Sequence, residues 1–537
     1  MQSISSNIGR YRPVVLFVIL ACTAILFVLG VRSPDSFVRS GSASYVMIAR
    51  NVAATGFYSL DGENATAMRP PAYPLFLAAT MVLGGVDHWA VLALFWQGAT
   101  AALCLALTAL IAHRLFANPL LTAISTLLVA GNIPLMAEFF AMRETGLFVL
   151  LTLLFVLLAL APLRPIAVAA LLGAIAALAM LTRPSGVVLL SAAAIVLVYR
   201  AWPSPKRAAH SLAAYATVLC LCLAPWQVWL HQTFDRLSLS GTSTGGMNLF
   251  KGNHPLMGEI YNLADVDQVD PMIPEILRQA GLDRSQDEWL ADDHLARLAV
   301  ESILVNPVRF VRRTAEKAIA FLSPANVPIG RGGAVQFVDG TFVVQEPVVV
   351  VGSPRLLYHL FVIPLGILGV AGALLIPARR LWGLCAGALI AGTVLVYAVT
   401  FPEKRYRFPI EPLLAIAAVG AVHRYFVPGS CQLESVRPLL DRLNPVDPGQ
   451  REPERARANP AQAGNAEYWA LRLRGRTDGS DAASSRAQSV RRRWHGMLRA
   501  EHRAVARGAV ARRGQRCLSV PQRRLCHRGG GRLLVLR

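Results

Sequence analysis

Charged residues are scarce in this sequence: only 16% of its 537 residues are Asp, Glu, Lys or Arg, whereas 54% are hydrophobic. A soluble domain has about 25% charged residues, so the composition argues against a soluble multidomain protein. Paired cysteines are lacking as well. The eight cysteines lie within apolar stretches or near the C-terminus, without disulfide-type or metal-ligand spacing. The sequence therefore indicates neither a disulfide scaffold nor a cysteine-ligated zinc site.

The apolar residues gather in stretches long enough to cross a membrane. A transmembrane helix needs about 20 mostly apolar residues. Ten stretches come close to this length: 13–31, 89–112, 118–137, 144–162, 165–182, 184–199, 209–230, 355–376, 381–400 and 409–427. The first follows two arginines, yet it is long for a signal peptide and lacks a small-x-small cleavage site, so we interpret it as a retained helix. We expect an all-α polytopic membrane protein with about 10 transmembrane helices.

Basic residues in the short loops predict the orientation of the chain. If the N-terminus is cytoplasmic, ten spans place the short basic turns on the cytoplasmic side, as the positive-inside rule requires. These turns contain Arg114, Arg164, Arg200, Lys206, Arg207, Arg379 and Arg380. The same count places two long loops, 32–88 and 231–353, on the outer, periplasmic side. We expect a multi-pass protein of the bacterial inner membrane, with residues 1–430 as its membrane domain.

The net charge of +21 does not indicate nucleic-acid binding, because most of it lies in one segment. From Ser430 onward the chain has 23 arginines, no lysine and 9 acidic residues. This segment has little periodicity, and its composition is typical of disorder. We predict that residues 431–537 form a disordered cytoplasmic tail without an assigned function. Translation of a GC-rich gene in another frame would give a similar composition.

The first long loop contains two helical segments. In SYVMIARNVAATG, Tyr45, Ile48, Ala49 and Val52 have the spacing of one apolar helix face, which suits a helix lying on the membrane surface. The next segment, RPPAYPLFLAATMVLGG, starts with two prolines and has too few apolar residues to cross. We interpret it as a re-entrant or juxtamembrane helix.

The second long loop is large enough to form a small α+β lid. A helical pattern runs from Trp289 to Leu322, with Leu295 and Ala299 on one face. Further on, AVQFVDGTFVVQ alternates like a β-hairpin around Asp339-Gly340.

Ionisable groups gather near the outer ends of the predicted spans, where they are costly unless they are used or paired. Arginine there could hold the phosphate of a lipid carrier by two parallel hydrogen bonds, and a nearby carboxylate could take a proton from an acceptor. Snorkelling anchors and solvated ion pairs would give the same pattern. The histidines lack metal-ligand spacing, so we expect no metal site built from them. The candidate residues are Asp35, Arg69, Tyr73, Glu144, Arg183, Lys404, Arg405 and Arg407.

In order and spacing, several segments resemble the GT-C membrane glycosyltransferases of the dolichyl-phosphate-mannose protein mannosyltransferase and aminoarabinose transferase type. These segments are YVMIARNVAATGFYSLDG, TAMRPPAYPLFLA, AMRETGLFVL, LTRPSG, APWQVWLHQTF with STGGMNLFKGNHPLMG, and RYRFPIEPLLAIAA. The resemblance covers residues 10–427. It implies a helical membrane bundle, a catalytic carboxylate in the first outer loop and a sugar donor on a polyprenyl phosphate. It also implies inversion at the anomeric carbon, no organic cofactor, and a glycan, lipid or protein acceptor. Nothing in the sequence indicates a divalent cation.

One departure from the family concerns the catalytic acid. The family places an acidic residue four positions before the tyrosine that opens the interfacial helix; here that tyrosine is Tyr45 and the position is Gly41. Asp35 is the nearest upstream carboxylate, and we predict that it is the general base, with Glu144 as the alternative. The residues predicted to bind the donor phosphate or the substrate are Arg69, Tyr73, Arg183, Lys404, Arg405 and Arg407.

Two other functions are compatible with the sequence. A transporter or flippase for a lipid-linked precursor would also be polytopic, although such proteins often have internal repeats and mid-membrane charges, which we do not find in the sequence. A catalytically silent relative that binds lipid-linked sugar would explain the glycine at position 41. The first hypothesis is a glycosyltransferase acting at the outer face of the membrane.

Overall fold

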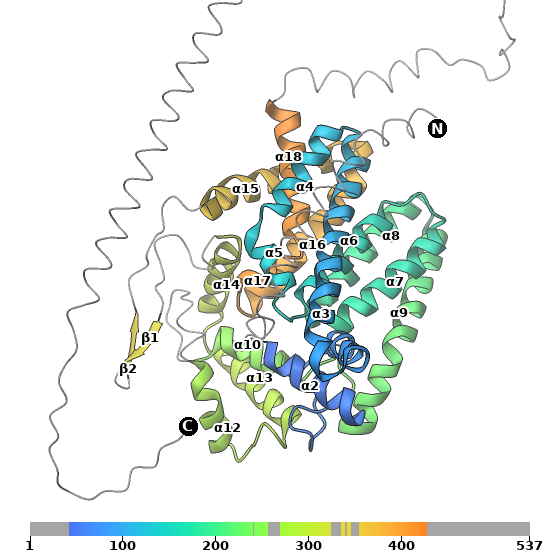
Figure 1. Cartoon of the computed structure of the whole chain (residues 1–537). Helices are drawn as coiled ribbons and strands as arrows, with labels where there is room; N and C mark the ends of the chain where they lie inside the picture. Colours follow the sequence, from blue (N-terminus) through green and yellow to red (C-terminus); the bar gives the residue numbers. More distant parts are fainter. Residues whose placement is uncertain are drawn as a thin grey trace, which may run out of the picture. The chain divides into compact units, whose positions relative to one another are not determined.

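The computed structural model describes residues 42–239, 241–255, 269–323, 335–338, 341–344 and 354–426. The first predicted span, 13–31, lies outside these residues, as do Asp35, Gly41 and the tail 431–537. Within them the chain is almost entirely helical, and the helices pack around a large apolar core (Figure 1). The prediction of an all-α polytopic membrane protein is confirmed.

The elements follow the apolar pattern of the sequence closely. The bundle contains α3 (Ala72–Phe116), α4 (Pro119–Ala130), α5 (Ile133–Phe139), α6 (Thr145–Ala159), α7 (Pro165–Thr182), η3 (Pro184–Val187), α8 (Val188–Ala201), α9 (Pro205–Phe234), α15 (Pro354–Leu375), η5 (Pro377–Arg379), α16 (Arg380–Val399), α17 (Lys404–Arg407) and α18 (Glu411–Phe426). The long loops contain α2 (Ala43–Thr55), α10 (Gly245–Asn253), η4 (Asp270–Met272), α12 (Ile273–Gln279), α13 (Glu288–Val305), α14 (Pro307–Leu322), β1 (Val335–Val338) and β2 (Thr341–Val344). The two strands pair antiparallel, so the predicted hairpin is confirmed.

Five of the described helices are long and apolar enough to cross a membrane. They are the His88–Phe116 part of α3, which we call its second arm; helix α7; η3 together with α8; helix α9; and η5 together with α16. The bent pair of α4 and α5 would make a sixth span, whereas α6 and the Leu360–Leu375 part of α15 are apolar but shorter. The predicted total of ten spans therefore stays a prediction.

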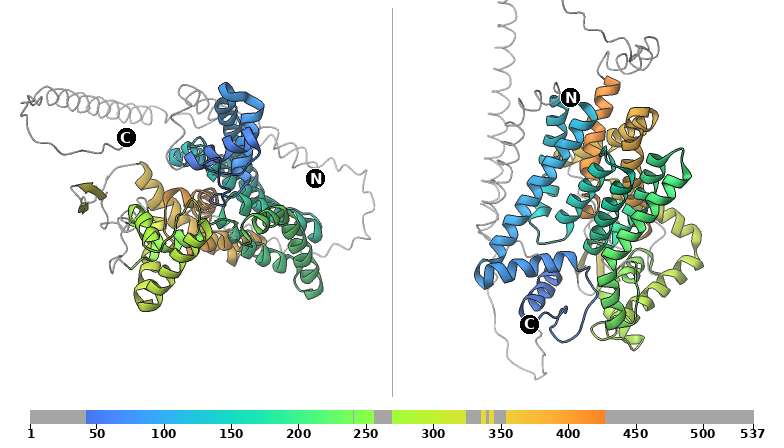
Figure 2. Two further views of the ribbon diagram at one scale, coloured as in Figure 1. Left: turned by 90° about the horizontal axis from the view of Figure 1, so that it is seen from below. Right: turned by 90° about the vertical axis from the view of Figure 1, so that its right-hand side faces the viewer.

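Helix α3 consists of two arms that meet at Gly85. The backbone of Gly85 has a φ of 64°, a left-handed conformation that glycine adopts without steric cost. The first arm, Ala72–Gly85, is too short to span, and Figure 2 (right) shows it running across the direction of the second arm, which rises along the bundle. This geometry agrees with the predicted juxtamembrane helix after Pro70 and Pro71.

The predicted span 118–137 is broken at Asn132. Helices α4 and α5 meet there at an angle of 67°. Asn132 accepts a hydrogen bond from the backbone N–H of Leu135 and donates one to Glu411. Pro134 lies in the first turn of α5, where backbone N–H groups lack a helical partner, and proline has no N–H that would need one. The bend directs α5 toward the loop that carries Glu144.

Glycines let α15 and α18 approach closely, because a Cβ atom on Gly369 would collide with the carbonyl oxygen of Ala417. We expect Gly369→Ala to force the helices apart and to lower the free energy of unfolding by about 1–3 kcal/mol. Gly387 is the matched control, since its Cβ would lie 3.4 Å from Val370, in ordinary contact. Reversible unfolding in mixed detergent micelles would measure both variants. Equal stability of Gly369→Ala and Gly387→Ala would contradict the close crossing.

The described helices α2, α10, α12 and α13 of the two long loops lie at the same end of the bundle, which we call the loop end (Figure 1). The carboxylate of Glu288 in α13 accepts hydrogen bonds from Thr66, Ala67 and Ser243. Burial raises the pKa of Glu288, and these hydrogen bonds oppose the rise. The second loop is therefore docked on the first, as expected for a lid.

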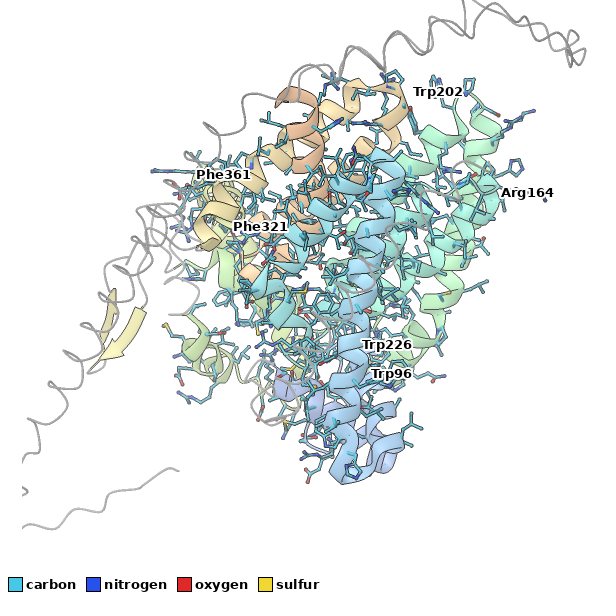
Figure 3. All side chains as sticks on the ribbon, turned by 45° about the horizontal axis from the view of Figure 1, so that its top comes forward. Trp96, Arg164, Trp202, Trp226, Phe321 and Phe361 are labelled. Carbon is cyan, nitrogen blue, oxygen red and sulfur yellow. The ribbon has the colours of Figure 1, made fainter. Side chains whose placement is uncertain are left out.

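The short basic turns lie at the opposite end. There Arg114 and Arg200 donate hydrogen bonds to backbone carbonyls near the C-terminal end of α6, where positive charge is favourable. Figure 3 shows Arg164 and Trp202 at this end and Trp226 nearer the loop end. The short basic turns and the two long loops therefore lie at opposite ends of the bundle, as the sequence predicts.

Candidate functional site

A buried carboxylate–guanidinium pair lies at the ends of two helices. Glu144 directly precedes α6, and Arg183 directly follows α7. The extended backbone of Arg183 is what a residue before proline favours, so Pro184 ends α7 at this position. Nε of Arg183 lies 3.7 Å from Oε1 of Glu144, and both side chains are 5% exposed. Two candidates that are 39 positions apart in the sequence therefore form one ion pair.

The guanidinium of Arg183 has unused hydrogen-bonding capacity. Its Nη1 and Nη2 atoms are buried and find no hydrogen-bond partner among the described residues. The group lies 4.4 Å from the ring centre of Tyr406 and 5.8 Å from that of Tyr397, and such stacking fixes its plane. Two parallel donors held in this way match two oxygens of a phosphate or carboxylate.

Arg405 brings a second cation to the site from α17. Its positive charge stabilises the carboxylate of Glu144, less strongly than the charge of Arg183 does. Its Nε lies 2.9 Å from the carboxylate of Glu403, and its guanidinium lies 5.1 Å from the ring centre of Tyr406. The guanidinium groups of Arg405 and Arg183 therefore both contact the ring of Tyr406.

Arg69 contributes a third cation from the first long loop. It also acts on Glu144, its Nε donates a 2.9 Å hydrogen bond to Ser44, and it lies 4.8 Å from the ring centre of Tyr45. The ring of Tyr45 meets that of Tyr73 edge-on at 5.4 Å. Burial, and after it the charge of Glu144, raises the pKa of Tyr45, which keeps this hydroxyl protonated. The structure therefore brings Arg69, Arg183 and Arg405 together around Glu144.

Sequence reasoning missed Glu138. This residue belongs to α5, is 9% exposed, accepts a 3.2 Å hydrogen bond from Thr145 and lies 3.6 Å from Nη1 of Arg143. The turn between Glu138 and Glu144 contains Met142, which is buried with a φ of 51°. A non-glycine residue in that region is strained, as is common at functional sites. A lone acid within the apolar segment IPLMAEFF was the signal for Glu138.

Arg407 is not placed among these cations. It is 2% exposed, its Nε lies 2.8 Å from Glu411, and Nη1 donates to the backbone carbonyls of Phe321 and Ser323. Its side chain joins α14, α17 and α18. The side chain of Lys404 and the whole of Asp35 lie outside the described structure, so their predicted roles stay predictions.

Lys317 in α14 holds the lid against the bundle. Its buried ammonium donates to the carbonyl oxygens of Gly252 at 3.2 Å and Thr400 at 2.7 Å. Burial lowers the pKa of Lys317 to about 7, and the neighbouring charge of Arg313 adds to this. Thr400 begins the loop that leads to Arg405, so Lys317 helps to position that cation.

The site can therefore bind an anion beside a carboxylate and several tyrosines. Over the residues that the structure describes, no group of three or more His, Cys, Asp or Glu side chains could hold a metal ion. The chemistry available from these side chains is charge stabilisation, hydrogen bonding and proton transfer.

No protein-family model and no curated protein matches the sequence. Among solved structures, the apo oligosaccharyltransferase of Archaeoglobus fulgidus is similar, with 13% identity, a TM-score of 0.42, and coverage of 81% of this chain and 52% of that chain. ArnT from Cupriavidus metallidurans is similar in its apo state, with 17% identity, a TM-score of 0.31, and coverage of 74% and 77%. The same protein bound to undecaprenyl phosphate gives 15% identity, a TM-score of 0.30, and coverage of 78% of each chain. The chain thus spans about half the length of the first of these.

Proposed function

We propose that the protein is a glycosyltransferase that moves a sugar from a polyprenyl-phosphate donor to an acceptor at the outer face of a bacterial inner membrane. The observation that carries the proposal is the guanidinium of Arg183, whose two buried terminal nitrogens find no hydrogen-bond partner in the described structure. An anion with two oxygens in one plane, such as a phosphate monoester or diester, fits these donors.

The surroundings of Arg183 suit a leaving phosphate. When an acceptor hydroxyl attacks the anomeric carbon, the bond from that carbon to the phosphate oxygen breaks, and negative charge grows on the phosphate. Arg183, with Arg69 and Arg405 near it, would stabilise that charge. A carboxylate must accept the proton of the hydroxyl. Asp35 is our first choice for this base, because Glu144 is already paired with Arg183.

The motifs that resemble GT-C enzymes support the same reaction, as does the loop end, where the lid is docked over the first loop. We place this end on the periplasmic side, because the basic turns lie at the other end. We propose a polyprenyl-phosphate-linked sugar as donor, a glycan, lipid or protein as acceptor, and no organic cofactor.

The test compares two carboxylate variants in phosphatidylcholine nanodiscs with a radiolabelled polyprenyl-phosphate sugar. For Asp35→Asn we expect kcat to fall by about 10²–10⁴-fold with donor affinity unchanged, as for the loss of a general base. For Glu144→Gln we expect weaker donor binding, because Arg183 loses the group that positions it. Measurements are donor release, product formation and donor binding.

Three outcomes would contradict the proposal. The first is that the wild-type protein neither binds nor cleaves the donor. The second is that it moves intact donor between leaflets without cleaving it, which would favour a flippase. The third is that both variants match the wild type, which would place the chemistry elsewhere.

A further inference from the structure

A small polar cavity lies in the corner between the two arms of α3, beside α5 and α6. Its volume is about 30 Å³, room for about two water-sized groups. Its apolar wall consists of Phe76, Phe139 and Leu147. Its polar wall consists of Tyr73, Gln97, Arg143 and Thr100, and the Thr100 hydroxyl already donates to the carbonyl of Trp96. Figure 2 (right) shows the two arms of α3 that form this corner.

The polar wall offers one acceptor and one donor that the protein does not use. Gln97 is only 5% exposed, and its Nε2 donates to the hydroxyl of Tyr73. Its Oε1 is buried with no hydrogen-bond partner in the described ranges, and the same holds for Nε of Arg143. Both residues line the cavity, so a ligand there is placed to satisfy these two atoms.

The depth of the cavity limits what can reach it. Gln97 lies nine residues into the span that begins at His88, which corresponds to about 14 Å along the helix. Phe76 and Leu147 on the cavity wall are partly exposed, and Trp96 beside Gln97 is 47% exposed. These exposed faces lie on the side of the helix that would face lipid, and a polar residue at this depth in a span indicates a function.

The unpaired atoms also select the chemistry of the ligand. A hydroxyl donates to Gln97 Oε1 and accepts from Arg143 Nε at once, whereas a carboxylate could not donate and an ammonium could not accept. The apolar wall of Phe76, Phe139 and Leu147 suits the alkyl chain next to that hydroxyl.

We propose that this cavity is a binding site for the hydroxyl group of a membrane-borne lipid alcohol, and that the acceptor of the proposed transfer is such a lipid. The second part rests on the proposed function. The cavity adjoins the anion site through two residues: Tyr73 contacts Tyr45, and Arg143 pairs with Glu138. A lipid held here therefore lies at the edge of the charged cluster.

Photolabelling tests this binding site without any sugar donor. A negative result would therefore contradict the lipid site and leave the proposed transfer reaction untouched. The full chain in phosphatidylcholine nanodiscs is irradiated with a diazirine-bearing fatty alcohol or with its O-methyl ether, and labelled peptides are mapped by mass spectrometry. We expect the alcohol to label peptides 72–100 and 139–147 about tenfold more than the ether, because the ether cannot donate to Gln97.

Variants make the test specific. Gln97→Leu should remove the preference for the alcohol. Leu147→Trp keeps the Gln97 side chain but should fill the cavity and abolish labelling. Thr108→Val is the matched control, since Thr108 is a buried hydroxyl on the same helix that bonds to the carbonyl of Cys104. It should label as the wild type does. Equal labelling by alcohol and ether, unchanged labelling of both variants, or density for an ordered water only in an alcohol-soaked structure would overturn the proposal.

Discussion

Replacing Arg183 with alanine is expected to lower kcat/KM for donor cleavage by about 10²–10³-fold, the range found when one donor to a developing negative charge is removed. The two terminal nitrogens of Arg183 are buried and have no hydrogen-bond partner among the described residues, so binding an anion loses no existing bond. Its plane is already fixed over the ring of Tyr406. Arg183→Lys should retain part of the activity, because it keeps the charge but loses the two parallel donors.

Arg200→Ala is the matched control for this prediction. Arg200 also follows an apolar run in a spanning helix and donates to the carbonyl of Ala159, but it lies at the opposite end of the bundle. We expect its kcat/KM to equal that of the wild type. Thermal unfolding should be recorded for each variant, since Arg183→Ala also removes a stacking contact. A folded Arg183→Ala protein that cleaves donor at the wild-type rate would show that the anion site is not used.

The sequence predicts the helical bundle and the convergence of charges for the same reason. Apolar stretches define the spans, and alternating sides then bring every second connection to one end of the bundle. Glu144 and Arg183 each lie in such a connection, and they form an ion pair in the structure. The topology fixes the end of the bundle but not which side chains touch.

Contacts between side chains depend on packing that periodicity does not contain. The bend at Asn132 turns α5 inward and brings Glu138 to the site, although the run around it reads as one straight span. In the sequence, Tyr406 is one residue of the basic segment RYRFP, and nothing there predicts that its ring lies 4.4 Å from Arg183 and 5.1 Å from Arg405. The strained backbone of Met142 likewise depends on tertiary packing.

The sequence around Arg407 carries two signals, a resemblance to the GT-C motif and the spacing of a helical ion pair. Arg407 and Glu411 are four positions apart, the spacing of neighbours on one helix face. In the structure they form a 2.8 Å pair with side chains 2% and 1% exposed. The spacing alone would have favoured a structural ion pair over contact with a donor phosphate.

Arg407→Met is expected to lower the free energy of unfolding by about 3–5 kcal/mol, because it leaves Glu411 charged and buried without its cation. It also leaves the backbone carbonyls of Phe321 and Ser323 without this donor at the end of α14. The double variant Arg407→Met, Glu411→Leu removes both charges and should recover much of that loss. Reversible unfolding in mixed micelles would measure the three proteins.

The same variants decide between the two roles of Arg407. If it only joins α14 to α18, then the double variant, once folded, should bind the donor with wild-type affinity, and the difference between the single and the double variant should appear in stability alone. If it contacts the donor phosphate, then donor affinity should stay low even where stability is recovered. The burial of its guanidinium among protein acceptors favours the first result. Lost affinity in a stable double variant would instead mean that the pair with Glu411 opens when the donor binds.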